Sequence, residues 1–164
     1  MDTSSKIKGI RELARIVGRI RSQGKKVVFT NGCFDLLHYG HVQYLEKARA
    51  MGDVLVVALN SDASVRRLKG NWRPVVGQHD RARVLAGLAS VGLVTVFGDD
   101  TPERVIRAVR PDCLVKGADW KTKDIAGADF VRSYGAEVRI IRLAQGRSTS
   151  TLIEKIRHAA AARG

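Results

Sequence analysis

Cysteine is scarce in this sequence: Cys33 and Cys113 are the only two among 164 residues. They stand far apart and in no paired metal-ligand spacing, which argues against a disulfide-rich scaffold and against a zinc site. We interpret both as reduced thiols, and the sequence predicts no metal ion held by the protein alone.

Long hydrophobic runs are absent as well. No stretch approaches the roughly 18 apolar residues that a membrane-spanning helix needs, and residues 1–8 lack the apolar segment of a signal peptide. We therefore expect a soluble, cytoplasmic protein with no membrane partner. With 45% hydrophobic residues, the chain is long enough to bury the core of one ordinary domain.

Aromatic residues make up only 5% of the chain, so few rings are available on which bases could stack. Positive charge, in contrast, is abundant: 29 Lys and Arg against 16 Asp and Glu give a formal net charge of +13. This excess favours anionic partners, either polymeric or small and phosphorylated. Because the basic residues are spread along the chain without a dense tract, we expect no specific nucleic-acid partner.

From residue 25 onward, short β-branched runs alternate with helical stretches, and Gly, Asp or Asn separate them. Continuous apolar runs such as 54–59 are typical of strands in a parallel sheet that helices cover on both faces. The alternation predicts an α/β fold, a Rossmann-like doubly wound parallel sheet of about five strands with helices on both faces. The predicted strands are 26–30, 54–60, 93–97, 113–116 and 137–142; the predicted helices are 41–51, 80–88, 102–109, 125–134 and 150–162, the third with Thr101 as N-cap and Pro102 as first residue.

An amphipathic segment precedes this pattern. Ile7, Ile10, Leu13, Val17 and Ile20 fall on one face of a helix over 7–20, with basic residues on the other faces. A basic amphipathic helix can lie on a membrane, but the apolar face has no Trp or Phe, which favours packing against the domain. With no internal repeat and no long linker, we expect one domain over 1–164: a leading helix within 1–24 and an α/β core over 25–164.

Two histidines mark the loop after the first predicted strand, where doubly wound sheets bind ligands. The loop contains neither G-x-G-x-x-G nor G-x-x-x-x-G-K-[ST], so it is not one of the common phosphate loops. Instead it has His38, Tyr39, Gly40 and His41 at the predicted start of a helix, whose dipole favours anions. Two histidines at this spacing could also be metal ligands or packed side chains, but zinc requires a third ligand and none is evident nearby. The position favours a catalytic site for a phosphorylated substrate.

The segment resembles the cytidylyltransferase-like superfamily, whose G-x-F-D-x-L-H-x-G-H motif is matched over 32–41. Further segments are similar to one branch, the heptose 1-phosphate adenylyltransferases, and the resemblance extends nearly to the carboxyl terminus. Members of this branch occur alone or as the carboxyl-terminal domain of a kinase fusion, and this chain resembles the stand-alone form. The segments are 60–62, 66–70, 73–75, 99–102, 114–117 and 125–127.

The resemblance implies transfer of AMP from ATP to D-glycero-D-manno-heptose 1-phosphate, giving ADP-heptose and pyrophosphate for the lipopolysaccharide core. A sugar phosphate is already ionised, so the protein needs no general base, only hydrogen-bond donors and positive charge around the α-phosphate. Mg²⁺ is the expected cofactor and accompanies ATP, and a homo-oligomer, a dimer or larger, is expected. The expected catalytic residues are His38, His41 and Lys69; the expected nucleotide-binding residues are Thr30, Asn31, Gly32, Cys33, Phe34, Gly40, Lys116, Gly117, Asp119, Ser148, Thr149 and Ser150; further candidates are Asp35, Asp62 and Arg73.

Three other readings stay open at this point. The same chemistry would serve a cytidylyltransferase for glycerol 3-phosphate or a similar polyol phosphate, or a guanylyltransferase for a heptose 1-phosphate, because a few loop contacts decide the base. A basic nucleic-acid-binding domain would account for the charge but not for the histidine loop, and it predicts binding that depends steeply on salt.

Overall fold

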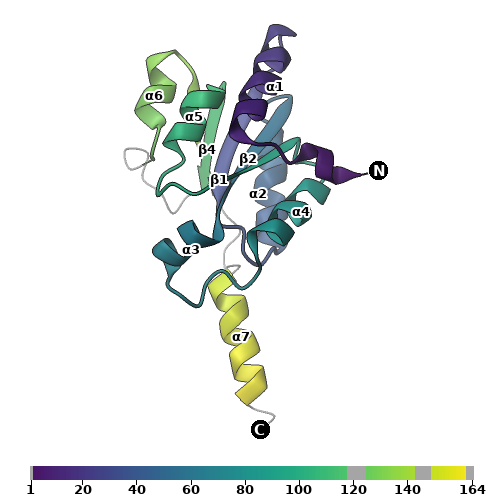
Figure 1. Cartoon of the computed structure of the whole chain (residues 1–164), viewed down its shortest axis with the longest axis vertical. Coiled ribbons are helices and arrows are strands. Elements are labelled where there is room, and N and C mark those ends of the chain that lie inside the picture. Colours follow the sequence, from purple (N-terminus) through teal and green to yellow (C-terminus); the bar gives the residue numbers. More distant parts are fainter. Residues whose placement is uncertain (1, 118–124, 143–148, 162–164) are drawn as a thin grey trace.

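A single parallel β-sheet organises the computed structural model, which describes residues 2–117, 125–142 and 149–161 (Figure 1). Its strands follow the order β3-β2-β1-β4-β5, and every neighbouring pair is parallel. The predicted α/β fold with five strands is therefore confirmed. The strands are β1 (Val27–Gly32), β2 (Val54–Asn60), β3 (Leu93–Phe97), β4 (Cys113–Gly117) and β5 (Glu137–Ile141).

Helices cover both faces of this sheet, which explains why its central strands are apolar on both sides. The helices α2 (Tyr39–Arg49) and α4 (Gln78–Gly87) pack on one face. The helices α1 (Ile10–Ser22), α5 (Glu103–Val109) and α6 (Ala128–Ser133) pack on the other. Successive residues of β1 and β2 consequently alternate between two apolar cores.

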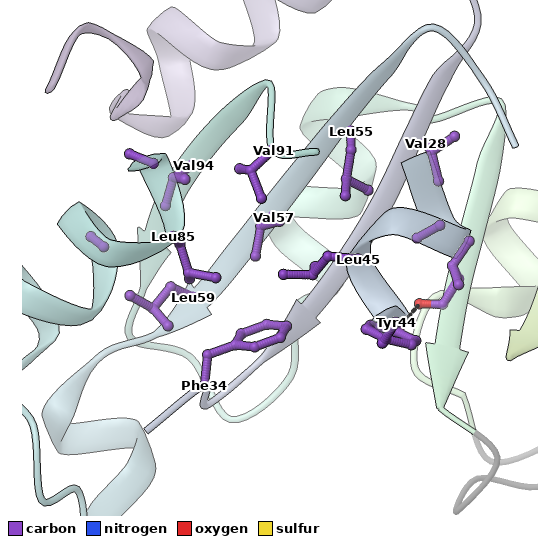
Figure 2. Packing of buried hydrophobic residues seen from close by; sticks show 14 of the residues in the cluster. Val28, Phe34, Tyr44, Leu45, Leu55, Val57, Leu59, Leu85, Val91 and Val94 are labelled. Carbon is purple, nitrogen blue, oxygen red and sulfur yellow. Dashed lines mark hydrogen bonds between the residues drawn. The ribbon is translucent and has the colours of Figure 1, made fainter. Parts of the chain in front are cut away.

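Figure 2 shows the core beneath α2 and α4. Leu45 of α2 and Leu85 of α4 are fully buried against Val57 and its neighbours in the sheet. Tyr44 brings a polar group into this core, and its hydroxyl lies 2.7 Å from the Thr30 hydroxyl and donates to the Val115 carbonyl at 3.3 Å. This core fixes α2, and therefore the histidines at its start, against β1.

The order of the strands places a crevice at one edge of the sheet. The chain leaves β1 toward β2 and β3 on one side, and later returns to β4 and β5 on the other. The strand order therefore reverses between the neighbouring strands β1 and β4, and such a reversal leaves room for a ligand at the carboxyl ends of the strands. The histidine segment follows β1 and lies at this point.

Two helices lie beyond the carboxyl edge of the sheet (Figure 1). The first is α3 (Asp62–Lys69), for which we predicted no helix; Ser61 caps it by accepting from the Ser64 amide at 3.2 Å. The second is α7 (Thr149–Ala161), which extends away from the body of the molecule and agrees closely with the predicted helix over 150–162.

Several predicted boundaries are wrong by a few residues. The helix predicted over 7–20 starts later than expected: Ile7 bridges to Val94 of β3, and α1 starts only at Ile10. A short 3-10 helix over residues 3–6 precedes it. Pro102, not Thr101, is the N-cap of α5, without a side-chain cap. The helix predicted over 125–134 is shortened to α6, because Gly127 precedes it in the left-handed conformation. Among the residues that the structure describes, no helix combines the length and hydropathy of a membrane span.

Candidate active site

A cavity of about 610 Å³ lies at the carboxyl edge of the sheet. Its wall is built from the ends of β1, β2 and β4, from the first turn of α2, and from residues that follow β3. It therefore occupies the position where a doubly wound sheet binds its ligands. The lining residues that sequence analysis singled out are Asn31, Gly32, Cys33, Phe34, Asp35, His38, Gly40, His41, Lys69, Arg73, Lys116, Thr149 and Ser150.

The two histidines form a stacked pair in this wall. Their ring centroids are 3.9 Å apart, and the ring planes differ by 28°. His38 is the N-cap residue of α2, and its carbonyl accepts from the His41 amide at 2.9 Å. The helix thus begins two residues before the predicted start at 41. Since the first amides of a helix lack intrahelical partners, both imidazoles lie beside a point that favours anions.

Phe34 determines how the loop reaches this position. It adopts a left-handed backbone conformation with φ of 43°, which is unusual for a bulky residue. Its ring is 7% exposed, and its centroid lies 5.4 Å from that of His41. A Cβ atom on Gly32 would lie 3.0 Å from the same ring. Glycine at position 32 therefore allows Phe34 to fold back and pack behind the histidine pair.

Burial makes His41 a neutral imidazole near physiological pH. Desolvation, with a smaller contribution from the neighbouring His38, lowers the pKa of His41 to about 4. Its Nδ1 atom and the Asn31 side-chain oxygen are buried, and neither has a hydrogen-bond partner among the described residues. A neutral imidazole still has one N–H donor, so His41 can stabilise negative charge by hydrogen bonding without a formal charge of its own.

Asp35 ties the histidine loop to the segment that follows α3. Its carboxylate accepts from the amides of Val75 and Val76, each at 2.9 Å, and from the Arg73 guanidinium at 2.5 Å. Its side chain is 0% exposed and that of Arg73 7%. Burial alone would raise the pKa of Asp35, but these hydrogen bonds outweigh it and hold the pKa below its usual value. The carboxylate is thus engaged in building the loop.

Arg81 of α4 connects the same loop to α3. Its side chain is completely buried and donates to the carbonyls of Cys33 at 2.5 Å and Val76 at 2.8 Å. A third bond, at 2.7 Å, reaches the carboxylate of Asp62, the first residue of α3. Because Lys69 is the last residue of α3, Arg81 links the histidine loop to the helix that carries this lysine.

Cationic groups surround the thiol of Cys33. Burial raises the pKa of this thiol, and the charges of Lys69, Arg81 and Arg73 oppose the increase. Lys116, at the end of β4, is 8% exposed, and desolvation lowers its pKa to about 8. Much of the positive charge that the cavity offers to an anion therefore comes from side chains held by the fold. Within the described ranges, no group of three or more His, Cys, Asp or Glu residues could hold a metal ion.

Comparison with known proteins identifies the family. Residues 29–156 match the family described as Cytidylyltransferase-like. The chain belongs to this family. The match begins in β1, contains the whole histidine segment and ends in α7, so it includes every part of the cavity wall. The family resemblance predicted from the sequence is confirmed.

Members with high sequence identity carry one name. The chain is 54% identical over 155 residues to "Bifunctional protein HldE" of Citrifermentans bemidjiense, which covers 94% of this chain and 32% of that protein. The protein of the same name from Wolinella succinogenes is 56% identical over 144 residues, covering 88% and 30%. The chain thus spans about a third of the length of the curated relatives it matches.

Solved structures support the same fold. A lipopolysaccharide core biosynthesis protein from Thermoplasma volcanium superposes with a TM-score of 0.60 at 27% identity, covering 76% of this chain and 100% of that chain. A pantoate-beta-alanine ligase from Francisella tularensis gives a TM-score of 0.59 at 14% identity, covering 88% and 68%, and indicates similarity of fold alone.

The remaining predicted site residues divide into three groups. Thr149 and Ser150 at the start of α7 line the cavity, and the Thr149 hydroxyl donates to the Leu36 carbonyl of the histidine loop at 3.3 Å. Thr30 is buried beside Tyr44, and neither it nor Asp62 or Gly117 is among the described lining residues. Asp119 and Ser148 lie outside the described residues.

Sequence analysis missed part of this cytidylyltransferase-like site. The motif at 99–102 was recognised without a role, yet three of its residues line the cavity. Their position directly after a predicted strand was the available signal, because all parallel strands end at the same edge. Arg81 had no such signal, since its partners are far away in sequence. The lining residues that lie in recognised segments but had no role assigned are Asn60, Leu68, Asp100, Thr101, Pro102 and Ala126.

Proposed function

We propose that the chain transfers AMP from ATP to D-glycero-D-manno-heptose 1-phosphate, releasing pyrophosphate and producing ADP-heptose for the lipopolysaccharide core. The observation that carries the proposal is the stacked His38 and His41 pair at the start of α2, inside a cavity lined by lysines. Family membership supports nucleotidyl transfer. The choice of sugar rests on the identity to proteins named HldE and on the relative named for lipopolysaccharide core biosynthesis.

The reaction is an in-line displacement at the α-phosphorus of ATP. A phosphate oxygen of the sugar 1-phosphate forms the new P–O bond, and the bond to pyrophosphate breaks. Because this oxygen is already ionised, the site needs no base to remove a proton. It must instead stabilise the charge that accumulates on the α-phosphate oxygens, which N–H donors held in fixed positions do well.

The donors available for this task are concentrated around α2. The proposal assigns His38, His41 and the first amides of α2 to the α-phosphate, where Gly40 permits close approach of the backbone. Lys69 and Lys116 are assigned to the phosphate groups, and Thr149 and Ser150 to the triphosphate. The family resemblance alone supports a nucleotide-binding role for Thr30, Gly117, Asp119 and Ser148. The proposal assigns the positioning of the histidine loop and of α3 to Asp35, Asp62, Arg73 and Arg81.

Mg²⁺ enters this proposal as part of the substrate MgATP. Among the described residues, the carboxylates that line the cavity are Asp35 and Asp100, and each pairs with an arginine. These residues do not form a dedicated metal site, so the ion is assigned to phosphate oxygens of the nucleotide. No step of the proposed reaction is derived from protein ligands to the metal.

Pyrophosphate release tests the function directly. The protein is incubated with heptose 1-phosphate and, in separate reactions, ATP, CTP or GTP, and the nucleotide sugar is identified by mass. We expect ADP-heptose from ATP. Release with CTP and glycerol 3-phosphate, or with GTP and heptose 1-phosphate, in place of ATP would reassign the substrates. His38→Ala and His41→Ala should each lower kcat by about 10²-fold to 10³-fold, and unchanged kcat would refute the assigned mechanism.

We also propose a homo-oligomer, a dimer or larger, acting in the cytoplasm, where ATP is available. Exposed apolar side chains support association: Leu68 is 50% exposed, Trp72 53% and Ile156 62%. Trp72 lies next to α7, since the Arg157 guanidinium is 5.1 Å from its ring centroid. Sedimentation equilibrium is expected to give at least twice the monomer mass of 18.0 kDa; a monomer at micromolar concentration would refute the oligomer.

A further inference from the structure

The cavity extends along the edge of the sheet on both sides of the histidine pair. Toward β4 it is lined by Lys116 and by the start of α7. Toward β3 it is lined by Asn60 at the end of β2 and by Asp100 and Thr101 after β3. The crevice between β1 and β4 is where such sheets bind nucleotides. The β2–β3 side therefore remains for the second substrate.

The chemistry of the β2–β3 side differs from that of the phosphate region. It combines a carboxylate, a hydroxyl and a side-chain amide with the apolar surface of Leu68. A carboxylate facing a phosphate is unfavourable, whereas it accepts hydrogen bonds from hydroxyl groups readily. Polar acceptors flanked by apolar groups suit a sugar, which carries hydroxyls around a ring with C–H faces.

Asp100 pairs with Arg67 of α3, and the side chains are 76% exposed for Asp100 and 49% for Arg67, so the pair adds little stability and leaves the carboxylate open to a ligand. The Arg67 Nε atom donates to its Oδ1 atom at 2.7 Å, and Arg67 Nη2 donates to the Gly98 carbonyl at 2.5 Å. Arg67 thereby ties the loop after β3 to α3, the helix that ends in Lys69. A carboxylate has about four acceptor positions, so one bond from Arg67 leaves capacity for ligand hydroxyls.

We propose that Asp100, oriented by Arg67, binds hydroxyl groups of the sugar phosphate, with Thr101 beside it, and so determines selectivity for a polyhydroxylated acceptor. This inference rests on the proposed function and adds the location of the acceptor to it. The sugar lies on the β2–β3 side, its phosphate points toward the histidine pair, and the nucleotide lies on the β1–β4 side.

The matched test compares Asp100→Asn with Asp99→Asn. Asn at 100 keeps an oxygen that can accept from Arg67 but removes the charge. The control residue Asp99 pairs with Arg104 at 2.8 Å and is not among the described lining residues. We expect Asp100→Asn to raise KM for heptose 1-phosphate about 10-fold to 100-fold with little change in kcat. KM for ATP should stay unchanged in Asp100→Asn. Asp99→Asn should have the same kinetic constants as the unsubstituted protein.

A series of monodeoxy heptose 1-phosphates completes the test. At least one analogue should be used poorly by the original chain, and this discrimination should disappear in Asp100→Asn. The inference is overturned if Asp100→Asn equals Asp99→Asn, if it raises KM for ATP equally, if it changes only the Mg²⁺ requirement, or if all discrimination persists. If the original chain forms no ADP-heptose from the complete substrates, the proposed function itself is refuted, so the two failures differ.

Discussion

The buried Arg81 offers the sharpest test of how the site is assembled. Replacing it with methionine preserves much of the side-chain volume but removes three charge-assisted hydrogen bonds. The carbonyls of Cys33 and Val76 lose a donor, and Asp62 loses its cationic partner. Removing one partner of a buried ion pair typically costs about 3 to 5 kcal/mol. Since the Asp62 side chain is 28% exposed and can be hydrated, we expect the lower part of this range, about 3 kcal/mol.

The assay is urea unfolding, supported by thermal unfolding. For a chain of this size, about 3 kcal/mol corresponds to a decrease in Tm of roughly 6 to 12 °C. The matched control is Arg83→Met in the same helix, because Arg83 pairs with Asp2 at 3.3 Å and its side chain is 39% exposed. An exposed pair of this kind contributes about 0 to 1 kcal/mol. Equal stability of the two variants would refute the role assigned to Arg81.

Two further predictions concern pH. The pKa of His41 in the folded protein, about 4, lies below its unfolded value near 6.5. The contribution of neutral His41 to the free energy of unfolding is therefore complete above about pH 6.5. It is lost progressively as the pH falls toward 4, by roughly 1 to 3 kcal/mol, and urea titrations without ligand measure this loss. His41→Asn should flatten that decline, and an unchanged slope would contradict the assignment. The pKa of Lys116 is about 8, so this side chain loses its positive charge as the pH increases through this value, and KM for ATP should rise. Lys116→Met should show a high KM for ATP without that inflection. An inflection retained in the variant would exclude Lys116 as its source.

The sheet could be predicted from the sequence because its signals are local. The strands β2 (Val54–Asn60) and β3 (Leu93–Phe97) coincide with the predicted ranges, since apolar runs bounded by Gly, Asp or Asn define both. The helix α3 was missed because it is short and its apolar signal is weak. Its Ser61 cap and the left-handed Gly70 at its end, with φ of 96°, were the available signals.

The histidine loop was predicted in position but not in detail. The motif located the histidines at a strand-to-helix turn, and the structure places them between β1 and α2 and in the first turn of α2. The stacking of the two rings, the burial that keeps His41 neutral, and the fold of Phe34 against Gly32 depend on tertiary contacts. Asp35 was expected from the sequence only as a further candidate for the site. Its bonds to Arg73, Val75 and Val76 favour loop building.

Nonlocal pairing also explains why the positioning residues were overlooked. Arg81 lies 48 positions from Cys33 in the chain, and Arg67 lies 33 positions from Asp100. Sequence patterns identify the strands whose ends meet, but they do not specify which basic side chain turns inward. In a chain with 29 Lys and Arg residues, only the folded structure distinguishes a buried arginine from a solvated one.

In the proposed mechanism, the stacked histidine pair stabilises transfer of AMP from ATP to a sugar phosphate. The most direct measurement is single-turnover formation of ADP-heptose from saturating MgATP and heptose 1-phosphate, for the original chain and for His38→Ala and His41→Ala. We expect ADP-heptose with the unsubstituted chain, and a rate about 10²-fold to 10³-fold lower in each variant. Product formation at the original rate in both variants would contradict it.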